Sequence, residues 1–190
     1  MNFREMKKPK QPSETPFKEG WAKERRFQRS ESDLEAEYFF RGKWHPAKTI
    51  TISAGGAYLA CRAHKIREND LIDLVIVLEG LTIITISRVV WVNPLKMKNN
   101  QGFPYPPGFA VEFEKIPGEM RAAIDQYVKK SLRTLRALVY ELNLPVSDRE
   151  KIIRLFISLR PGDSTRLNHI RKVVKQEFRH FRLRKLDSYK

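Results

Sequence analysis

Residues 48–60 read Lys48-Thr-Ile-Thr-Ile-Ser-Ala-Gly-Gly-Ala-Tyr-Leu-Ala60 and predict two strands joined at a sharp corner. Before the corner, isoleucine alternates with hydroxyl residues, and the side chains of a strand point alternately to its two faces. We therefore expect Ile50 and Ile52 in a hydrophobic core. The opposite face carries the hydroxyl side chains of Thr49, Thr51 and Ser53.

The corner itself is Gly55-Gly56, and the next strand begins at Ala57. Because glycine has no side chain, another group can approach the backbone closely here. Small hydroxyl side chains followed by two glycines predict an open, shallow ledge on which a flat ligand can lie. The alternative interpretation is an ordinary hairpin with a glycine corner.

Alternating patterns around this stretch predict a mainly β domain. They indicate six strands, mostly joined by short turns, with a bulge near Ser87-Arg88 and a proline-rich loop over 94–108. A closed antiparallel barrel is the expected arrangement, because closure removes the exposed edges of a small sheet. The predicted strands cover residues 34–41, 43–53, 57–61, 71–79, 81–93 and 109–113.

From Pro117 the hydrophobic period changes from two to about 3.6, which is typical of helices. A long helix is expected over 117–143, a second over 147–159 and a third over 165–183. The first is longer than a small barrel needs, so its far half requires another partner. We expect the later helices to fold back on it as a small bundle; pairing with a second copy of the chain is the alternative.

The composition bounds the class of protein. With 190 residues the chain can bury one core plus appendages, and it has one cysteine, Cys61, and four histidines without metal-ligand spacing. No apolar run reaches the ~20 residues that span a membrane, and the first ten residues are not a secretory signal. A cytoplasmic protein without a metal is expected. The sequence shows no nucleophile–base pair of the kind that would suggest an enzyme.

The net charge of +15 lies at the two ends of the chain. Residues 1–30 carry nine Lys/Arg against four Asp/Glu, residues 31–116 carry ten of each, and residues 117–190 carry eighteen against eight. This distribution predicts three parts: a flexible arm over 1–22, a globular body over 23–142 and a basic helical extension over 143–190. Basic ends indicate an anionic partner, although they can also serve solubility alone.

Two short elements then point to a known family. Arg25-Arg26-Phe27-Gln28-Arg29 fits the R-x-x-x-R element of PilZ domains, and Thr51-Ile52-Ser53-Ala54-Gly55-Gly56 resembles their [D/N]-x-S-x-x-G element. The resemblance covers roughly residues 23–130. It implies a six-stranded PilZ-type barrel that binds cyclic di-GMP, a bacterial second messenger. The ligand-binding residues that it implies are Arg25, Arg26, Arg29, Thr51, Ser53, Gly55 and Gly56.

The chemistry of these residues suits such a ligand. Cyclic di-GMP is a dianion with two guanines, and arginine can bond phosphate oxygens bidentately, pair with guanine and stack on a purine. One position departs from the motif, because Thr51 stands where the family has Asp or Asn. Threonine offers one neutral hydroxyl in place of a charged or amide acceptor, which weakens the expected affinity by about tenfold.

Three functions follow in order of preference. The first is a cyclic di-GMP receptor or adaptor that passes nucleotide binding to a protein partner, expected to be acidic. The second is a divergent PilZ module that only binds a protein. The third is a nucleic-acid binder through the basic C-terminal helices, which lacks any recognised nucleic-acid motif.

Overall fold

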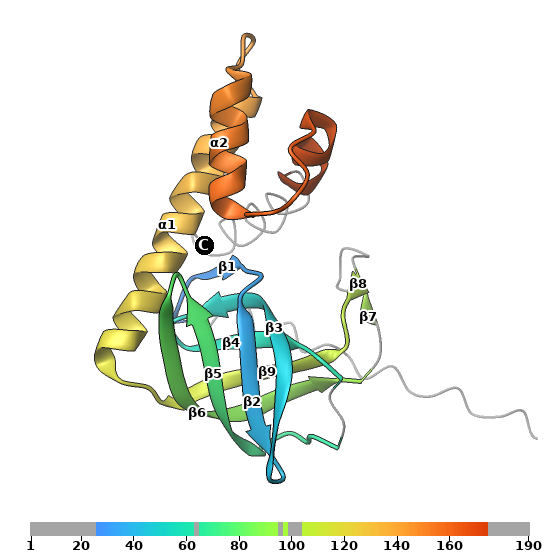
Figure 1. Cartoon of the computed structure of the whole chain (residues 1–190), viewed down its shortest axis with the longest axis vertical. Helices are drawn as coiled ribbons and strands as arrows, with labels where there is room; N and C mark the ends of the chain where they lie inside the picture. The colour runs from blue at the N-terminus through green and yellow to red at the C-terminus, as the bar shows by residue number, and fades with distance from the viewer. Residues whose placement is uncertain (1–25, 63–64, 95–96, 99–103, 175–190) are drawn as a thin grey trace, which may run out of the picture.

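The computed structural model of the chain describes residues 26–62, 65–94, 97–98 and 104–174. Six antiparallel strands close into a barrel in the order β3-β2-β5-β6-β9-β4, and β4 pairs back with β3 (Figure 1). The closed barrel expected from the sequence is confirmed. Its strands are β2 (Glu35–Phe40), β3 (Lys43–Ser53), β4 (Gly56–Ala60), β5 (Leu71–Leu78), β6 (Leu81–Asn93) and β9 (Gly108–Lys115).

A seventh strand joins this sheet from outside the barrel. β1 (Arg29–Glu31) pairs with the C-terminal end of β3, beyond the point where β2 stops pairing. The strands predicted from the sequence begin at residue 34, so β1 was not predicted. The loop over 94–108 likewise contains a two-stranded pairing of β7 (Met97–Lys98) with β8 (Pro104–Tyr105).

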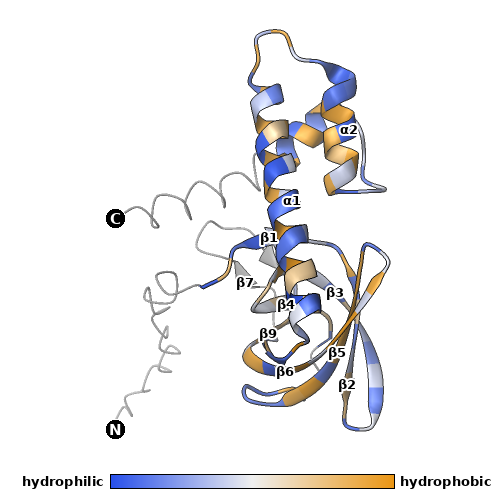
Figure 2. Cartoon of the chain, turned by 90° about the vertical axis from the view of Figure 1, so that its left-hand side faces the viewer, coloured by the Kyte–Doolittle hydropathy of each residue, from blue (hydrophilic) through white to orange (hydrophobic). Residues whose placement is uncertain are grey.

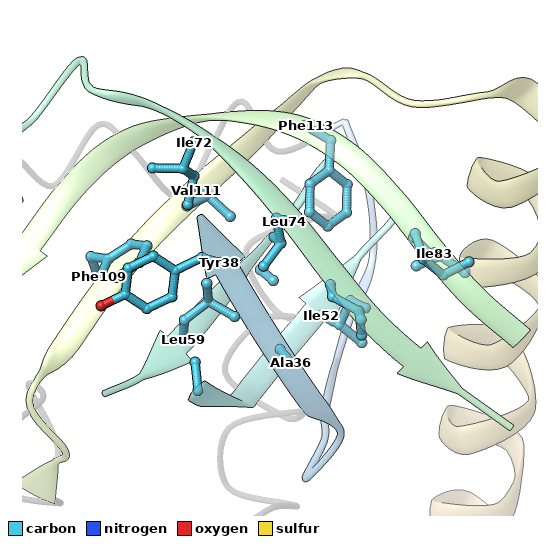
Figure 3. Close-up of a cluster of buried hydrophobic side chains, with 14 of the residues drawn as sticks. Ala36, Tyr38, Ile52, Leu59, Ile72, Leu74, Ile83, Phe109, Val111 and Phe113 are labelled. Atoms are coloured by element: carbon cyan, nitrogen blue, oxygen red, sulfur yellow. The ribbon is translucent and has the colours of Figure 1, made fainter. Parts of the chain in front are cut away.

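The barrel core follows the alternation of most strands. Ile50, expected in the core, is only half-buried and lies outside the core cluster, at the point where the register of β3 against β4 shifts between Thr49 and Thr51. Ile72, Leu74, Ile76 and Leu78 of β5 are all buried, as the pattern predicted. Figure 3 shows part of this core, in which the ring of Tyr38 meets that of Phe109 edge to face at 5.1 Å between centroids. The register of β6 against β9 shifts between Ile86 and Ser87 and again between Val89 and Trp91, so the predicted bulge is confirmed.

Two tight turns join neighbouring strands. Arg41 and Gly42 have φ of 51° and 78°, and Glu79 and Gly80 have φ of 48° and 86°. Positive φ at both central residues is typical of the two-residue hairpin turns that match strand twist. The glycine in each pair accepts this conformation without a steric cost.

Helices follow the barrel. α1 (Gly118–Leu142) begins against the barrel and extends beyond it, where α2 (Arg149–Leu159) packs along its far half (Figure 1). Residues 167–174 are also helical. The N-cap of α2 is Asp148, whose carboxylate accepts hydrogen bonds from the backbone N–H groups of Glu150 (2.9 Å) and Lys151 (3.1 Å). The sequence Ser147-Asp-Arg-Glu150 predicts a capping box, but none forms: Asp148 caps the helix, and its own N–H donates to Glu141 instead.

The described residues form two hydrophobic clusters. Barrel side chains pack with Ile124, Val128 and Leu132 from the first half of α1. A second cluster is formed by the far half of α1, α2 and the segment 167–174, and Figure 2 shows the hydrophobic faces of these helices turned toward one another. The expected intrachain bundle is confirmed. Its buried members are Leu135, Leu138, Ile152, Phe156, Ile170 and Val174.

Candidate functional site

The arginine-bearing element lies beside the hydroxyl stretch. Because β1 pairs with β3, Arg29 stands opposite Ser53 and Glu31 opposite Thr51. Residues directly opposite each other in an antiparallel pair place their side chains on the same face, with Cβ atoms about 5 Å apart. Ile52 belongs to the barrel core. The face shared by Arg29, Glu31, Thr51 and Ser53 is therefore the one that points away from that core.

The structure places most of the predicted site residues at this edge. Arg26 is exposed, Arg29 is half-buried, and the two glycines form the corner between β3 and β4. Arg25 lies outside the described residues. The predicted residues that the structure gathers around the end of β3 are Arg29, Thr51, Ser53, Gly55 and Gly56.

The hydroxyl face is not an open ledge, and that prediction is wrong. Thr51 and Ser53 are each only 2% exposed. Ser53 Oγ donates a hydrogen bond to the backbone oxygen of Gly56 (3.0 Å), which ties the glycine corner together. Thr49 Oγ1 accepts from the N–H of Leu34 (3.0 Å). At least two of the three hydroxyls therefore hold the ends of strands in place.

The two glycines of the corner have different surroundings. A Cβ added at Gly56 would lie 2.1 Å from the backbone oxygen of Val111, so this glycine permits β4 and β9 to approach closely. A Cβ at Gly55 would lie 2.6 Å from Cδ2 of Phe27 instead. Gly56 thus serves the barrel, while Gly55 provides a bare surface against which an aromatic side chain packs.

A third residue at the corner was not singled out by the sequence. Arg121, in the first turn of α1, donates from Nη1 to the backbone oxygen of Ala54 (3.0 Å). Its Cζ lies 5.8 Å from the centre of the Phe27 ring, which is the geometry of a cation–π contact. Arg121 and Ala54 are 67 residues apart in sequence. No local pattern connects them, so only the folded chain shows that α1 supplies a guanidinium to this corner.

Two titratable groups near the barrel core, Cys61 and Tyr38, have raised pKa values. Burial raises the pKa of Cys61 to about 11, and burial also raises the pKa of Tyr38. Both groups therefore stay neutral at ordinary pH. Within the described residues, no group of three His, Cys, Asp or Glu side chains could hold a metal ion. No helix in the same part of the chain is long and apolar enough to cross a membrane.

The fold and site thus define a small closed barrel whose added edge strand carries arginine beside a Ser-x-x-Gly corner. A profile of the PilZ domain matches residues 23–130, which is more than half of the chain. The chain belongs to the PilZ domain family. The resemblance seen in the sequence is confirmed.

Solved structures with a similar fold include YcgR of Escherichia coli in complex with c-di-GMP, at 9% identity and a TM-score of 0.51 over 63% of this chain and 51% of that one. The PilZ domain of YcgR with c-di-GMP aligns at 11% identity and a TM-score of 0.49, over 62% of this chain and 98% of that one. The Bacillus subtilis inhibitor of motility MotI/DgrA aligns at 17% identity and a TM-score of 0.49, over 57% of this chain and 51% of that one.

At these identities the likeness concerns the fold. The chain spans about half the length of the MotI/DgrA chain and of the YcgR chain in the complex with c-di-GMP. No curated protein matches the chain.

Proposed function

We propose that this chain is a cyclic di-GMP receptor that binds the nucleotide where β1 lies beside the end of β3. The observation that carries the proposal is the register of the two strands, which sets Arg29 opposite Ser53. The arginine element and the Ser-x-x-Gly stretch are separate in the sequence, but Arg29 and Ser53 share one face of the sheet. The PilZ family match and the similar fold of YcgR, solved in complex with c-di-GMP, support the same ligand.

The chemistry of the ligand explains the role of each group. The guanidinium groups of Arg25, Arg26 and Arg29 neutralise the two phosphates and can bond their oxygens or the guanine edge bidentately. Thr51 and Ser53 supply the barrel side of the site, and Gly55 provides a surface that a base can approach. We expect the protein to bind the nucleotide without converting it, because the site offers only charge, stacking surfaces and hydrogen bonds.

Nucleotide binding would be passed on through the helical module. Arg171 and Lys172 lie exposed on the helical segment 167–174, within a part of the chain that carries a strong positive charge. A basic, solvent-exposed helix fits an acidic protein surface. We therefore include an acidic protein partner in the proposal, reached through these helices.

A second function has its own support. Thr51 lacks the carboxylate or amide of the family motif, and both Thr51 and Ser53 are buried. These facts favour a divergent PilZ module that binds a protein partner without nucleotide.

Calorimetric titration of the full-length protein with cyclic di-GMP separates the two functions. We expect binding at micromolar affinity or tighter, weakened at least about tenfold in Arg29→Ala because a charge-assisted contact is lost. Arg133→Ala is the matched control, since Arg133 is an exposed arginine on α1 about three turns beyond Arg121. Absence of binding by the wild-type protein, or equal affinity of Arg29→Ala, would contradict the receptor function.

A further inference from the structure

The ring of Phe27 packs directly on the glycine corner. A Cβ built on Gly55 would lie 2.6 Å from Cδ2 and 3.1 Å from Cε2 of this ring, so the ring fills the space that any side chain at this position would need. Phe27 itself is 38% exposed, which is a high value for a phenylalanine. An aromatic ring thus lies on the surface of the corner, with much of its area open to solvent.

Arg121 approaches the same ring. Its guanidinium is 5.8 Å from the ring centre and is anchored by the hydrogen bond from Nη1 to the backbone oxygen of Ala54. Among the described residues no carboxylate forms an ion pair with Arg121. Within the described part of the chain, the charge of Arg121 is therefore available to an anionic ligand.

A glycine surface and a guanidinium near an aromatic face are what a bound purine requires. In the structure the ring of Phe27 lies in such a place, against Gly55 and near the guanidinium of Arg121. If cyclic di-GMP binds at this edge, as proposed above, one of its guanines can take the place of the Phe27 ring. The purine would be favoured because its O6 and N7 can accept hydrogen bonds from a guanidinium, whereas the phenylalanine ring can only stack.

We propose that Arg121 is a further ligand-binding residue and that Phe27 occupies the position of a guanine base on Gly55 until the nucleotide displaces it. This inference rests on the proposed cyclic di-GMP function and adds to it a residue from outside both motifs. Phe27 lies between Arg26 and Arg29 in sequence. Displacement of the ring therefore moves the same segment that carries the arginines to the ligand.

Two variants of the full-length protein test the exchange by calorimetry with cyclic di-GMP. Phe27→Ala should bind about three- to tenfold more tightly than wild type, because a site that is occupied by its own side chain loses apparent affinity in proportion to its vacant fraction. Arg121→Ala is made in the Phe27→Ala background, where no ring competes. There it should weaken binding about tenfold.

Two further variants serve as controls. Arg121→Lys, in the same background, keeps the charge but loses the planar fork, so it should stay at least about threefold weaker than Phe27→Ala. Arg133→Ala removes the same charge from an exposed position on α1 and should leave affinity unchanged. Thermal melts followed by circular dichroism confirm that each variant is folded.

The outcomes separate this inference from the function on which it rests. Wild-type binding that Arg29→Ala weakens, together with unchanged affinity in Phe27→Ala and no effect of Arg121→Ala, overturns the inference alone. Weaker binding by Phe27→Ala also overturns it, because the ring would then contact the nucleotide instead of competing with it. Tighter binding by Phe27→Ala than by wild type, weakened again by Arg121→Ala in that background, supports the exchange. Absence of binding by both proteins overturns the receptor function and the inference together.

Discussion

The corner after β3 shows how adjacent residues of one motif perform separate tasks. Ser53 closes the corner by donating to the backbone oxygen of Gly56. Gly56 lets two strands approach, and Gly55 presents a bare surface to Phe27. Because the two glycines meet different groups, substitutions at them should have different effects.

Gly56→Ala should destabilise the protein strongly. The added Cβ would lie 2.1 Å from the backbone oxygen of Val111, which cannot move without shifting β9. We expect a loss of about 2–3 kcal/mol, or a melting temperature lower by about 5–10 °C. Gly55→Ala is the matched control, because its new methyl group meets only the Phe27 side chain, which can rotate away. Equal melting temperatures for the two variants would show that the close approach of β4 and β9 is not required.

Thr51 can be tested with two substitutions. Thr51→Asn introduces the amide acceptor of the family motif without charge, and we expect cyclic di-GMP to bind several-fold more tightly. Thr51→Asp should keep only part of this gain and should melt a few degrees lower than wild type. The reason is that Glu31 stands opposite Thr51, at a position only 2% exposed, so the new carboxylate faces another in a buried place. Unchanged affinity of a folded Thr51→Asn variant would mean that Thr51 does not contact the ligand.

At the residue scale, the sequence predicted which residues gather at the end of β3, but it did not predict which other side chains and strands cover them. The spacing of the arginines and of the Ser-x-x-Gly stretch indicated a joint site, and the register of β1 with β3 brings the two elements together. The burial of Thr51 and the approach of Arg121 depend on segments distant in sequence. No local period encodes such contacts.

At the scale of the element, length decided which strands were predictable. β5 alternates over eight residues and has one face in the core, so its period is plain in the sequence. β1 has three residues, too few to show a period, and it forms because β3 continues beyond the end of β2 and leaves an edge to pair. An edge of this kind becomes visible only when the register of the neighbouring strands is known.

The turn between α1 and α2 is held by a buried carboxylate. Glu141 is 3% exposed, forms an ion pair with Lys151 (2.7 Å) and accepts a hydrogen bond from the backbone N–H of Asp148 (3.2 Å). The hydrogen bond from Lys151 is the main cause that lowers the pKa of Glu141. This side chain thus ties the end of one helix to the start of the next.

A lowered carboxyl pKa sets the direction of a pH dependence. The stabilisation is present above the pKa of an unfolded glutamate, about 4.3, and is lost as the pH falls through the lower value of the folded state. We expect the melting temperature of wild type to decrease below about pH 4 more steeply than that of Glu141→Gln, which has no carboxyl to protonate. At pH 7 the glutamine variant should melt lower, because Lys151 loses its partner. Parallel pH profiles of the two proteins would contradict this role.

At the scale of the whole molecule, one helix belongs to two hydrophobic clusters. Leu132 packs with the barrel, whereas Leu135, one turn later, packs with the helical module. The change of the hydrophobic period at Pro117 predicted the long helix, and its excess length predicted a partner for the far half. Which side of α1 the module would cover was not predictable, because that depends on how the short connections direct α2.

Separate clusters should unfold separately. Phe156 is 1% exposed in the helical module, and Phe156→Ala should destabilise that module by about 3–5 kcal/mol. Ile157→Ala is the neighbouring control, since Ile157 is 44% exposed and its loss should cost about 0.5 kcal/mol or less. Hydrogen exchange by residue should show faster exchange in α2 of the phenylalanine variant and unchanged exchange in β5 and β6. Equal acceleration in the barrel would mean that the two clusters unfold as one.

The continuity of α1 has a mechanical consequence. A helix of 25 residues is about 37 Å long, and no proline interrupts it between Gly118 and Leu142. The part of α1 beyond Leu132, its last residue in the barrel cluster, forms an arm about 15 Å long, so a tilt of about 10° there would move its end by about 3 Å. Because α2 packs on this arm, any tilt of α1 relative to the barrel carries α2 with it.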